Sequence, residues 1–591
     1  MRTVEEIKEL ADWLENDYHR ERIKLQNEDW TYYKDTFKVP FIKAPYKVSR
    51  LGSATDIVDS PVAHIITQHP QVYVEALSDT TVALERARKR GTYQNHIADF
   101  LTFQSPQPYK ELLKNLLARG DGWIHPVNNP SFNKDELFQD DIPIIYSIPD
   151  PIVVFGSPDE RNGVPDYVVV KYKRYYRSVM NRYEHWANPK HRGERDKYVE
   201  WLAYFDKDIR YFEADGQPVL PLIDTDDYGI QPNILGFTPF VHCYSGYGKA
   251  TPDGGPEELA VSRIRPVKGR IMLKTELASS LASQIKLYVH RRYDFIPNNP
   301  NAILPKDFKY DLNYGHWNFI PFGINVAERS GSAPASEAYN YLSMLDYEIS
   351  KVSPPVMQGM GTGSSGRQDD ISSKHGLAQY GSVIDNASTA WAMALGPMGL
   401  RILKNKDLGL LPVSIRASML EKGKKVRGEI TLKSEDIDDF HCVVKLKAAD
   451  PIEDKAQAQI GTAKWQAGEI DWMTNLTEYQ GKSFDEADEI INRRMAEDFI
   501  KNNPDLFNAM IMGINENLGI GATSVPQEAL GPQGQMAGPQ GQMAGPQGPI
   551  PGQPGAQGGP PRRGNIKSID ALAKDADMQL AARGPRRSPG L

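Results

Sequence analysis

The segment SEAYNYLSMLDYEISKVSPPVMQGMGTGSSGRQDDISSKHGLAQYGSVIDNASTAWAMAL (336–395) decides the fold prediction, because it places a glycine-rich loop between two helical patterns. The first pattern predicts a helix over 337–352 that Ser336 caps and Pro354-Pro355 ends. Its apolar stripe consists of Leu342, Leu345, Ile349 and Val352. The second pattern predicts a helix from about Ser373 to Leu395, which Gly396-Pro397 interrupts. Its stripe consists of Leu377, Tyr380, Ile384, Ala387, Trp391 and Ala394.

The loop between these helices contains Gly361-Thr-Gly363-Ser-Ser-Gly366, which matches the G-x-G-x-x-G pattern of phosphate-binding loops. A dinucleotide-binding loop follows a strand, precedes a helix, and has an acidic residue about 20 residues later. Here a helix and Pro-Pro precede the loop, and Arg367-Gln368 stands where a Walker A loop requires Lys-Ser/Thr. We therefore interpret the glycines as an interhelical loop, with nucleotide binding as the alternative.

A further helical pattern lies upstream, at 257–292, with Pro266 at its effective start or at a kink. Its apolar stripe consists of Val267, Ile271, Leu277, Ala278, Leu281, Ile285 and Tyr288. The opposite face carries the basic residues Lys268, Arg270, Lys274 and Lys286. The helix is therefore predicted to be amphipathic, and its basic face is either solvated surface or functional.

The remaining patterns predict an α+β fold. Helical periodicity covers the first 30 residues and most of 75–120, and β-branched and aromatic runs cover 142–156, 166–176 and 198–213. Such strands, separated by turn signals, suggest an antiparallel sheet with helices to one side. Short strands and loops are expected over 293–335, strands over 411–448 and helices over 453–517, followed from about 525 by low-complexity sequence in which GPQGQMA repeats.

Composition and charge narrow the possible functions. The 591 residues are 40% hydrophobic and 25% charged, which is ordinary for globular proteins. The net charge is −7, but residues 561–591 carry seven Lys/Arg against three Asp, so the rest of the chain is at −11. An acidic body argues against broad gripping of nucleic acid, although nucleic acid could still slide past it. Two cysteines, Cys243 and Cys442, are too few for a disulfide framework and favour a reducing, intracellular setting.

Enzymatic and metal-binding signatures are weak in this sequence. The acidic stretch at 222–229 has Leu235 where a calcium-binding loop requires Glu, so we interpret it as a solvated turn. Neither HExxH nor a Cys/His cluster occurs, and Ser364-Ser365-Gly366 does not follow a strand as a nucleophile elbow would. No secretory leader or membrane span is expected, and no cofactor or metal is predicted.

The order of these elements resembles the portal proteins, or head-to-tail connectors, of tailed double-stranded DNA bacteriophages. The resemblance rests on 336–395 and on VKLKAADPIEDKAQA (444–458), and the plan covers about residues 1–518. It implies a portal-type α+β fold with these parts: wing (1–255), first stem helix (256–292), clip (293–335), second stem helix (336–353), tunnel loop (354–372), long wing helix (373–405), β-rich wing or lower crown (406–452), helical crown (453–520) and a low-complexity tail (521–591). The unusually glycine-rich loop and the long tail depart from the family pattern.

The resemblance also implies a function. A portal is a non-enzymatic ring, usually of twelve subunits, at the unique capsid vertex of the virion, assembled in the host cytoplasm. It conducts double-stranded DNA and docks the terminase large subunit and then a head completion or adaptor protein, beside the major capsid and scaffolding proteins. By position, the implied DNA-facing residues are Gly361, Gly363, Ser364, Ser365, Gly366, Arg367, Gln368 and Lys374, with Lys268, Arg270, Lys274 and Lys286 on the stem-helix faces. The alternatives are a nucleotide-binding enzyme that uses Gly361–Gly366, and another capsid or tail structural protein.

Overall fold

The computed structural model divides the chain into two units, Met1–Phe507 and Asn508–Leu591. The structure describes only parts of the first unit: residues 2–40, 42, 47–66, 70–130, 132, 141–183, 186, 197–219, 229–252, 254–289, 292–298, 300, 303, 308–309, 319–329, 335–353, 376–421, 424–446, 451–482 and 484–502. It is 50% helical and 20% strand, which confirms the predicted α+β class.

Helices dominate the first 120 residues. They are α1 (Val4–Trp13), a π-helical turn η1 (Leu14–Tyr18), α2 (Arg20–Tyr33), α3 (Ser53–Ile65), α4 (Thr81–Thr102) and α5 (Pro108–Arg119). Those within the first 30 residues and within 75–120 were predicted, whereas the helix at Ser53–Ile65 was not. A capping box begins α1, since the side chains of Thr3 and Glu6 each accept a hydrogen bond from the other's backbone amide. Helix α5 ends at Gly120, whose φ of +90° and close approach to the backbone of Ala260 leave no room for a side chain.

An antiparallel six-stranded sheet follows, in the order β10-β9-β8-β7-β4 with β11 paired to β9. Its strands are β4 (Val154–Gly156), β7 (Tyr167–Tyr175), β8 (Tyr198–Asp206), β9 (Ile209–Ala214), β10 (Gln217–Pro218) and β11 (Ile230–Pro232). The run predicted as one strand over 198–213 is two strands. Asp206 breaks it, because its carboxylate accepts hydrogen bonds from the amides of Asp208 and Ile209 and closes a turn.

The two faces of this sheet are covered differently. Ile7, Ala11 and Leu14 of α1 and η1 pack on one face. The other face packs against Tyr176 and Val179 of α6 (Tyr176–Arg182) and against residues of a second sheet. The expectation of helices to one side is therefore wrong, since elements from the N-terminus and from the β7–β8 connection cover opposite faces.

The second sheet is three-stranded and antiparallel, in the order β12-β2-β3. Its strands are β2 (Asp121–Asn128), β3 (Ile144–Ser147) and β12 (Val241–Tyr244). The largest core packs α5 against α11 (Gly381–Met393), where the rings of Tyr109 and Trp391 lie 4.4 Å apart. Smaller elements are β1 (Gln71–Tyr73), η3 (Pro151–Val153), β5 (Glu160–Arg161), β6 (Val164–Pro165) and α7 (Pro256–Leu259).

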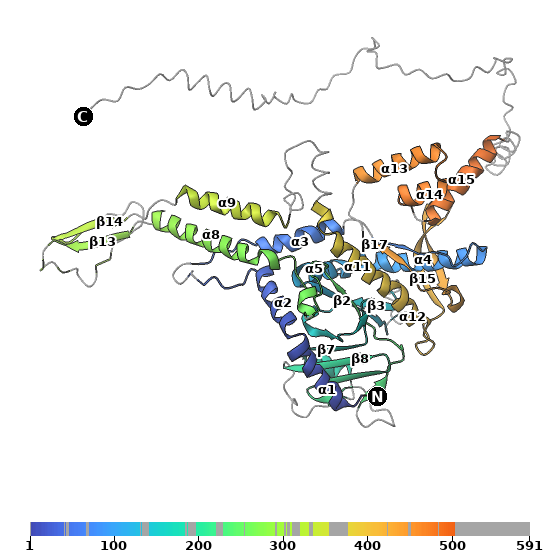
Figure 1. Cartoon of the computed structure of the whole chain (residues 1–591), viewed down its shortest axis with the longest axis horizontal. Helices are drawn as coiled ribbons and strands as arrows, with labels where there is room; N and C mark the ends of the chain where they lie inside the picture. The colour runs from blue at the N-terminus through green and yellow to red at the C-terminus, as the bar shows by residue number, and fades with distance from the viewer. Residues whose placement is uncertain are drawn as a thin grey trace, which may run out of the picture. The chain divides into compact units, whose positions relative to one another are not determined.

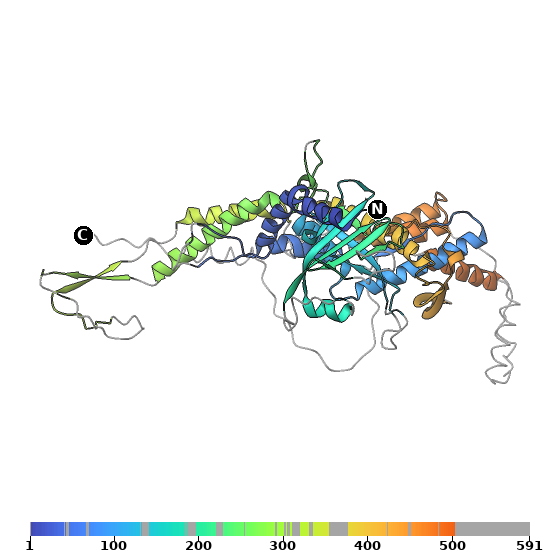
Figure 2. The ribbon, with the colours of Figure 1, turned by 90° about the horizontal axis from the view of Figure 1, so that it is seen from below.

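A pair of helices joined by a β-hairpin follows the second sheet. Helix α8 (Lys268–Val289) leads to β13 (Arg292–Pro297) and β14 (Ile324–Arg329), and α9 (Ser336–Ser350) returns beside α8 (Figures 1 and 2). The helix predicted over 257–292 therefore begins later than expected, after the 3₁₀ turn η5 (Arg265–Val267). The reason is local: Pro266 has no amide to donate, and the amide of Arg265 donates to the Ser262 hydroxyl instead.

The predicted start of α9 needs a correction. Ser336 is its first helical residue, Ala335 precedes it without a side-chain cap, and the Ser336 hydroxyl contacts the Glu337 carboxylate. Leu345 and Ile349 of the predicted stripe are buried, and the helix ends at Ser350. The expected stop at Pro354-Pro355 lies outside the described residues.

The long helix after the glycine-rich segment passes through Gly396-Pro397 instead of stopping there. Helix α11 continues as a π-helical turn η7 (Ala394–Met398) and then as α12 (Gly399–Lys404). The wider π turn accommodates Pro397, and a Cβ on Gly396 would lie 2.5 Å from the carbonyl oxygen of Phe440. The predicted interruption is therefore wrong, because tertiary packing overrides the local helix-breaking signal.

Strands and then helices complete the described chain, as predicted. The strands β15 (Val413–Glu421) and β16 (Lys424–Leu432) form a hairpin, and β17 (Val443–Lys445) pairs with β1. The turn η8 (Ser434–Asp436) lies between them, and the helices are α13 (Pro451–Gln466), α14 (Trp472–Thr474), η9 (Asn475–Tyr479) and α15 (Phe484–Asn502).

Candidate interaction faces of the helix pair

Ion pairs join α8 to α9 and define their antiparallel arrangement. Arg270 lies 3.6 Å from Glu348, and Lys274 pairs with Asp346 one turn further along. The residue numbers of the pairs rise along α8 and fall along α9, so the two helices are antiparallel. Two of the four basic residues predicted on the face of α8 thus bind carboxylates of α9, and Lys268 binds Glu28 of α2, so these three are not simply solvated.

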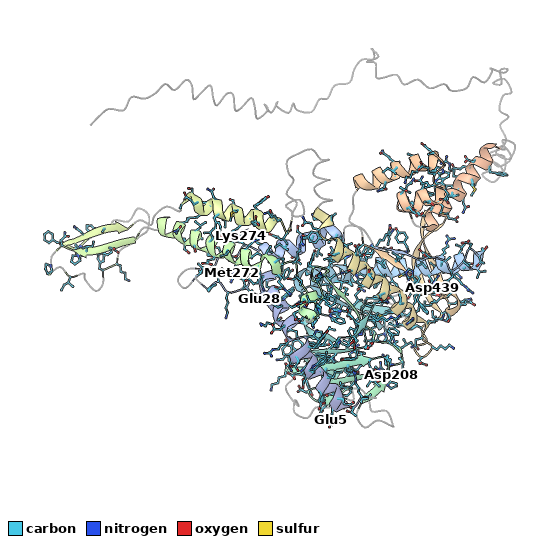
Figure 3. The ribbon with its side chains drawn as sticks, viewed as in Figure 1. Glu5, Glu28, Asp208, Met272, Lys274 and Asp439 are labelled. Atoms are coloured by element: carbon cyan, nitrogen blue, oxygen red, sulfur yellow. The ribbon has the colours of Figure 1, made fainter. Side chains whose placement is uncertain are left out.

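The first turn of α8 is anchored to α2 by a buried acidic group. Asp29 accepts hydrogen bonds from the Ser262 hydroxyl at 2.8 Å and from Arg265 at 3.0 Å. Lys268 pairs with the neighbouring Glu28 at 2.7 Å. Burial raises the pKa of Asp29, although the charge of Arg265 opposes this shift. Glu28 on α2 and Met272 and Lys274 on α8 mark this junction in Figure 3.

The inner face of α8 is more polar than its predicted stripe. Val267, Ile271 and Leu281 are buried as expected, but Thr275 and Ser279 are buried with them, whereas Ile285 is exposed. The Ser279 hydroxyl donates to the Thr275 carbonyl at 2.6 Å and accepts from the amide of Ser49 at 2.8 Å. These two bonds satisfy the buried Ser279 hydroxyl. From hydropathy alone, both Thr275 and Ser279 would be expected on the surface.

The outer faces of both helices are nearly uncharged. On α9, five exposed residues lie opposite the buried Leu345 and Ile349: Tyr339, Asn340, Ser343, Met344 and Tyr347. Tyr347 has 64% of its surface exposed. On α8, Leu273 and Ser280 are exposed in the same way. Lys351 lies over the ring of Tyr347, so one cation borders this face of α9. Exposed aromatic and sulfur-containing side chains with few charges among them are typical of a protein–protein contact face.

The hairpin between the helices also exposes apolar side chains. Phe319 and Phe322, which precede β14, are 92% and fully exposed, and Ile296 on β13 is 49% exposed. A two-stranded hairpin buries little surface by itself, so these residues gain stability only through a partner.

Arg263 holds together the two ends of the glycine-rich segment. Its guanidinium donates to the carbonyl of Val352, just before the segment, at 3.0 Å, and to the side-chain oxygen of Gln379, just after it, at 2.9 Å. It also lies over the rings of Tyr247 and Tyr380. The Tyr380 hydroxyl donates to the same Val352 carbonyl. Val352 and Gln379, on either side of residues 354–375, therefore share one anchor.

The residues predicted on this loop cannot be placed. Gly361, Gly363, Ser364, Ser365, Gly366, Arg367, Gln368 and Lys374 all lie outside the described residues. The acidic turn at 222–228 also lies outside them. Lys286, the last predicted residue of the α8 face, is exposed near the end of that helix. Sequence patterns did not indicate Arg263, because it is more than 80 residues away from both segments that it joins.

A buried charged cluster, here called the joint cluster, links α2 to both sheets. It consists of Arg22, Asp121, Glu160 and His242. Arg22 pairs with Asp121 at 2.7 Å, and Nδ1 of His242 lies 2.8 Å from Glu160. The imidazole of His242 stacks on Trp123 at 4.1 Å, and its Nε2 lies 3.7 Å from Asp121.

The protonation states in the joint cluster follow from these partners. Burial would lower the pKa of His242, but the carboxylates of Asp121 and Glu160 outweigh it and raise that pKa. Burial would also raise the pKa of Asp121, but Arg22 and His242 outweigh it and lower that pKa. Nearby His19 lacks such a carboxylate contact, so burial lowers its pKa to about 3. Because Arg22, Asp121 and His242 are all buried, the cluster has the character of a structural joint between elements rather than of a substrate site.

Metal sites, reactive cysteines and membrane-spanning helices are absent from the described residues. No group of three or more His, Cys, Asp or Glu side chains there is arranged to hold a metal ion. Both cysteines are buried and unpaired, and burial raises the pKa of Cys243 and brings that of Cys442 to about 12, so neither is a reactive thiolate. No described helix combines the length and the apolar character that a membrane crossing requires.

No protein-family model matches the chain, and no curated protein matches it. Any functional conclusion therefore rests on the residues and contacts described above.

Proposed function

We propose that this chain is a portal protein, a non-enzymatic subunit that assembles into a ring of about twelve copies around a DNA channel. The ring would occupy the unique vertex of a tailed-bacteriophage capsid and conduct double-stranded DNA during packaging and ejection. Its protein partners would be the terminase large subunit, a head completion or adaptor protein, and the capsid and scaffolding proteins.

One arrangement carries the proposal. The antiparallel pair α8–α9 has a hairpin at its turn, ion pairs along its length and a buried anchor on α2. The loop that follows, 354–375, has its ends fixed by Arg263 and leads into the long helix α11–α12. Two stem helices around a clip, followed by a tunnel loop and a long helix, are the parts that the resemblance to portal proteins implies.

The outer faces of the helix pair support self-association. A ring needs heterologous contacts, in which one face of each copy meets a different face of the next. The face of α9 around Tyr347, which Lys351 borders, and the exposed Leu273 of α8 are available for such a contact. Burying charged side chains there would be costly, whereas tyrosine, methionine and leucine are favourable at the centre of an interface.

The net charge of the chain fits a channel through which DNA slides better than a site that binds DNA tightly. Outside residues 561–591 the net charge is −11, and each copy in a ring repeats this charge. A predominantly acidic ring releases few counterions from DNA, so duplex would slide through it with little adhesion. A few basic residues such as Arg367 and Lys374 would then keep the duplex centred.

The proposal is tested by disrupting the outer face of α9. Tyr347→Glu places a charge in the proposed contact, so we expect the ring to dissociate into smaller species while the subunit keeps its fold. The matched control is Tyr172→Glu on β7, also at an exposed tyrosine but on a different element. Sedimentation velocity of both variants gives the assembly state. Equal assembly of Tyr347→Glu and wild type would remove this face from the ring contact.

A further inference from the structure

A strongly basic and aromatic stretch lies within this acidic chain. Residues 171–198 contain nine Lys/Arg against three Asp/Glu, together with five tyrosines and one tryptophan, whereas the whole chain has a net charge of −7. The stretch covers the end of β7, helix α6 and the start of β8. Such segregation of charge requires a reason, because opposite charges are normally interspersed on a surface.

Lys171, at the start of this stretch, forms ion pairs with carboxylates of the N-terminal helices. Its ammonium lies 2.6 Å from Glu15 and 3.4 Å from Asp12, so the cation is neutralised by the N-terminal helices. Beyond it, Lys173, Arg177 and Arg182 are exposed, and none of them has a carboxylate within ion-pair distance in the described part of the chain. Glu200 stands beside Lys173 across the strand pair and is the nearest acidic position in the register.

Aromatic rings lie beside these cations. Tyr175 and Tyr198 face each other across β7 and β8, with ring centroids 4.3 Å apart, and both are more than half exposed. On the other face of the strand pair, Arg174 lies over the ring of Trp201. Tyr175 and Tyr198 lie outside both core clusters of the sheet, so the exposed parts of their rings are available to a ligand.

We propose that this end of the sheet is a nucleic-acid-binding surface formed by Lys173, Arg177, Arg182, Tyr175 and Tyr198. The cations would contact phosphates, and the exposed tyrosine rings would stack on bases or pack on sugars. Arginine favours phosphate because its planar guanidinium matches two oxygens at once. An acidic protein surface would also attract the cations, and the competition experiment below distinguishes it from nucleic acid. The excess of nine Lys/Arg over three Asp/Glu in residues 171–198 favours the densely charged phosphate backbone. The surface is separate from the helix pair α8–α9, so it adds a second contact with nucleic acid to the proposed conduit.

The test measures binding of the full-length protein to a fluorescently labelled 20-nucleotide single strand and to a duplex of the same length. Fluorescence anisotropy is recorded between 50 and 200 mM salt. For three or four phosphate contacts, we expect the affinity for the single strand to fall with a log–log salt slope of about −2 to −3. The variant Arg177→Ala/Arg182→Ala should bind the single strand roughly tenfold more weakly and reduce the slope by about one.

Matched controls distinguish the effect of this surface on oligonucleotide binding from the effects of net charge and of the assembly state. Arg20→Ala/Lys207→Ala also removes two exposed cations, and Lys207 lies in the turn at the opposite end of the same strand pair. A second test variant, Lys173→Ala/Tyr175→Ala, probes the other face of the sheet end. Both test variants should keep the assembly state of the wild type, so that failure here is distinguishable from failure of the ring.

Two results would overturn the proposal. The first is equal binding of oligonucleotide by the wild type, both test variants and the control. The second is displacement of the oligonucleotide by polyglutamate of equal length and concentration, which would reassign the surface to an acidic protein partner.

Discussion

Arg263 joins two segments that are far apart in the chain, one on each side of residues 354–375. Its guanidinium is bonded to the Val352 carbonyl and the Gln379 side chain and lies over two tyrosine rings. Arg22 of the joint cluster acts in the same way: it pairs with Asp121 of the three-stranded sheet and donates to the Val154 carbonyl of the six-stranded sheet. At the scale of single residues, these charged side chains connect elements that are distant in the sequence.

Removing the Arg263 anchor should loosen the ends of the loop. Arg263→Ala loses charge-assisted hydrogen bonds at a partly exposed site, so we expect about 1 kcal/mol lower stability and faster hydrogen exchange at Tyr380. Urea unfolding and exchange measured by mass spectrometry check both effects. Arg401→Ala, which removes an exposed cation over Phe440, is the control and should leave exchange at Tyr380 unchanged. Unchanged exchange in Arg263→Ala would contradict the shared anchor.

The joint cluster predicts a pH-dependent contribution of His242 to stability. Its pKa is raised above 6.5 in the folded state, so its contribution is complete below pH 6.5 and is lost as the pH rises through the folded pKa. The stability difference between wild type and His242→Gln should therefore shrink between pH 6.5 and 9. Urea midpoints across this range measure the difference, with His441→Gln at an exposed site as the control. A difference that grows with pH would show that His242 is neutral in the folded protein.

At the scale of elements, local patterns predicted the helices well but not their contacts. The periodicity of 337–352 and 373–395 found α9 and α11, because a stripe of apolar residues depends only on neighbours in the sequence. The buried hydroxyls of Thr275 and Ser279 and the passage of the helix through Pro397 could not be predicted, because both depend on packing against distant segments. The basic face of α8 was visible in the sequence, but its acidic partners on α9 were not.

The pair Lys274–Asp346 tests the antiparallel arrangement directly. Lys274→Glu places two acidic groups together at a partly buried site, so we expect about 1 kcal/mol lower stability. Adding Asp346→Lys should recover part of this loss, although the bond from Lys274 to the Ser53 hydroxyl is not restored. Thermal unfolding of the two single variants and the double variant gives the coupling energy. Additive losses without recovery would place the two residues apart.

At the scale of the whole molecule, the acidic body and the anchored helix pair fit a subunit that works as one of many copies. The residue patterns predicted the two helices and short strands between them, but not that β13 and β14 pair as a hairpin. The predicted DNA-facing residues, from Gly361 to Lys374, lie outside the described residues and remain predictions. The joint cluster and the surface at the end of β7–β8 were not predicted, because their members are brought together only by folding.

Imaging of the purified full-length protein by negative-stain electron microscopy, with its mass determined by mass photometry, tests the central claim most directly. The portal proposal predicts closed rings of about twelve subunits with a central opening wide enough for duplex DNA. A nucleotide-dependent enzyme using Gly361–Gly366 predicts instead a monomer or dimer that binds a nucleotide. Rings with a central opening are the expected result, and a monomer or dimer without rings would contradict the account.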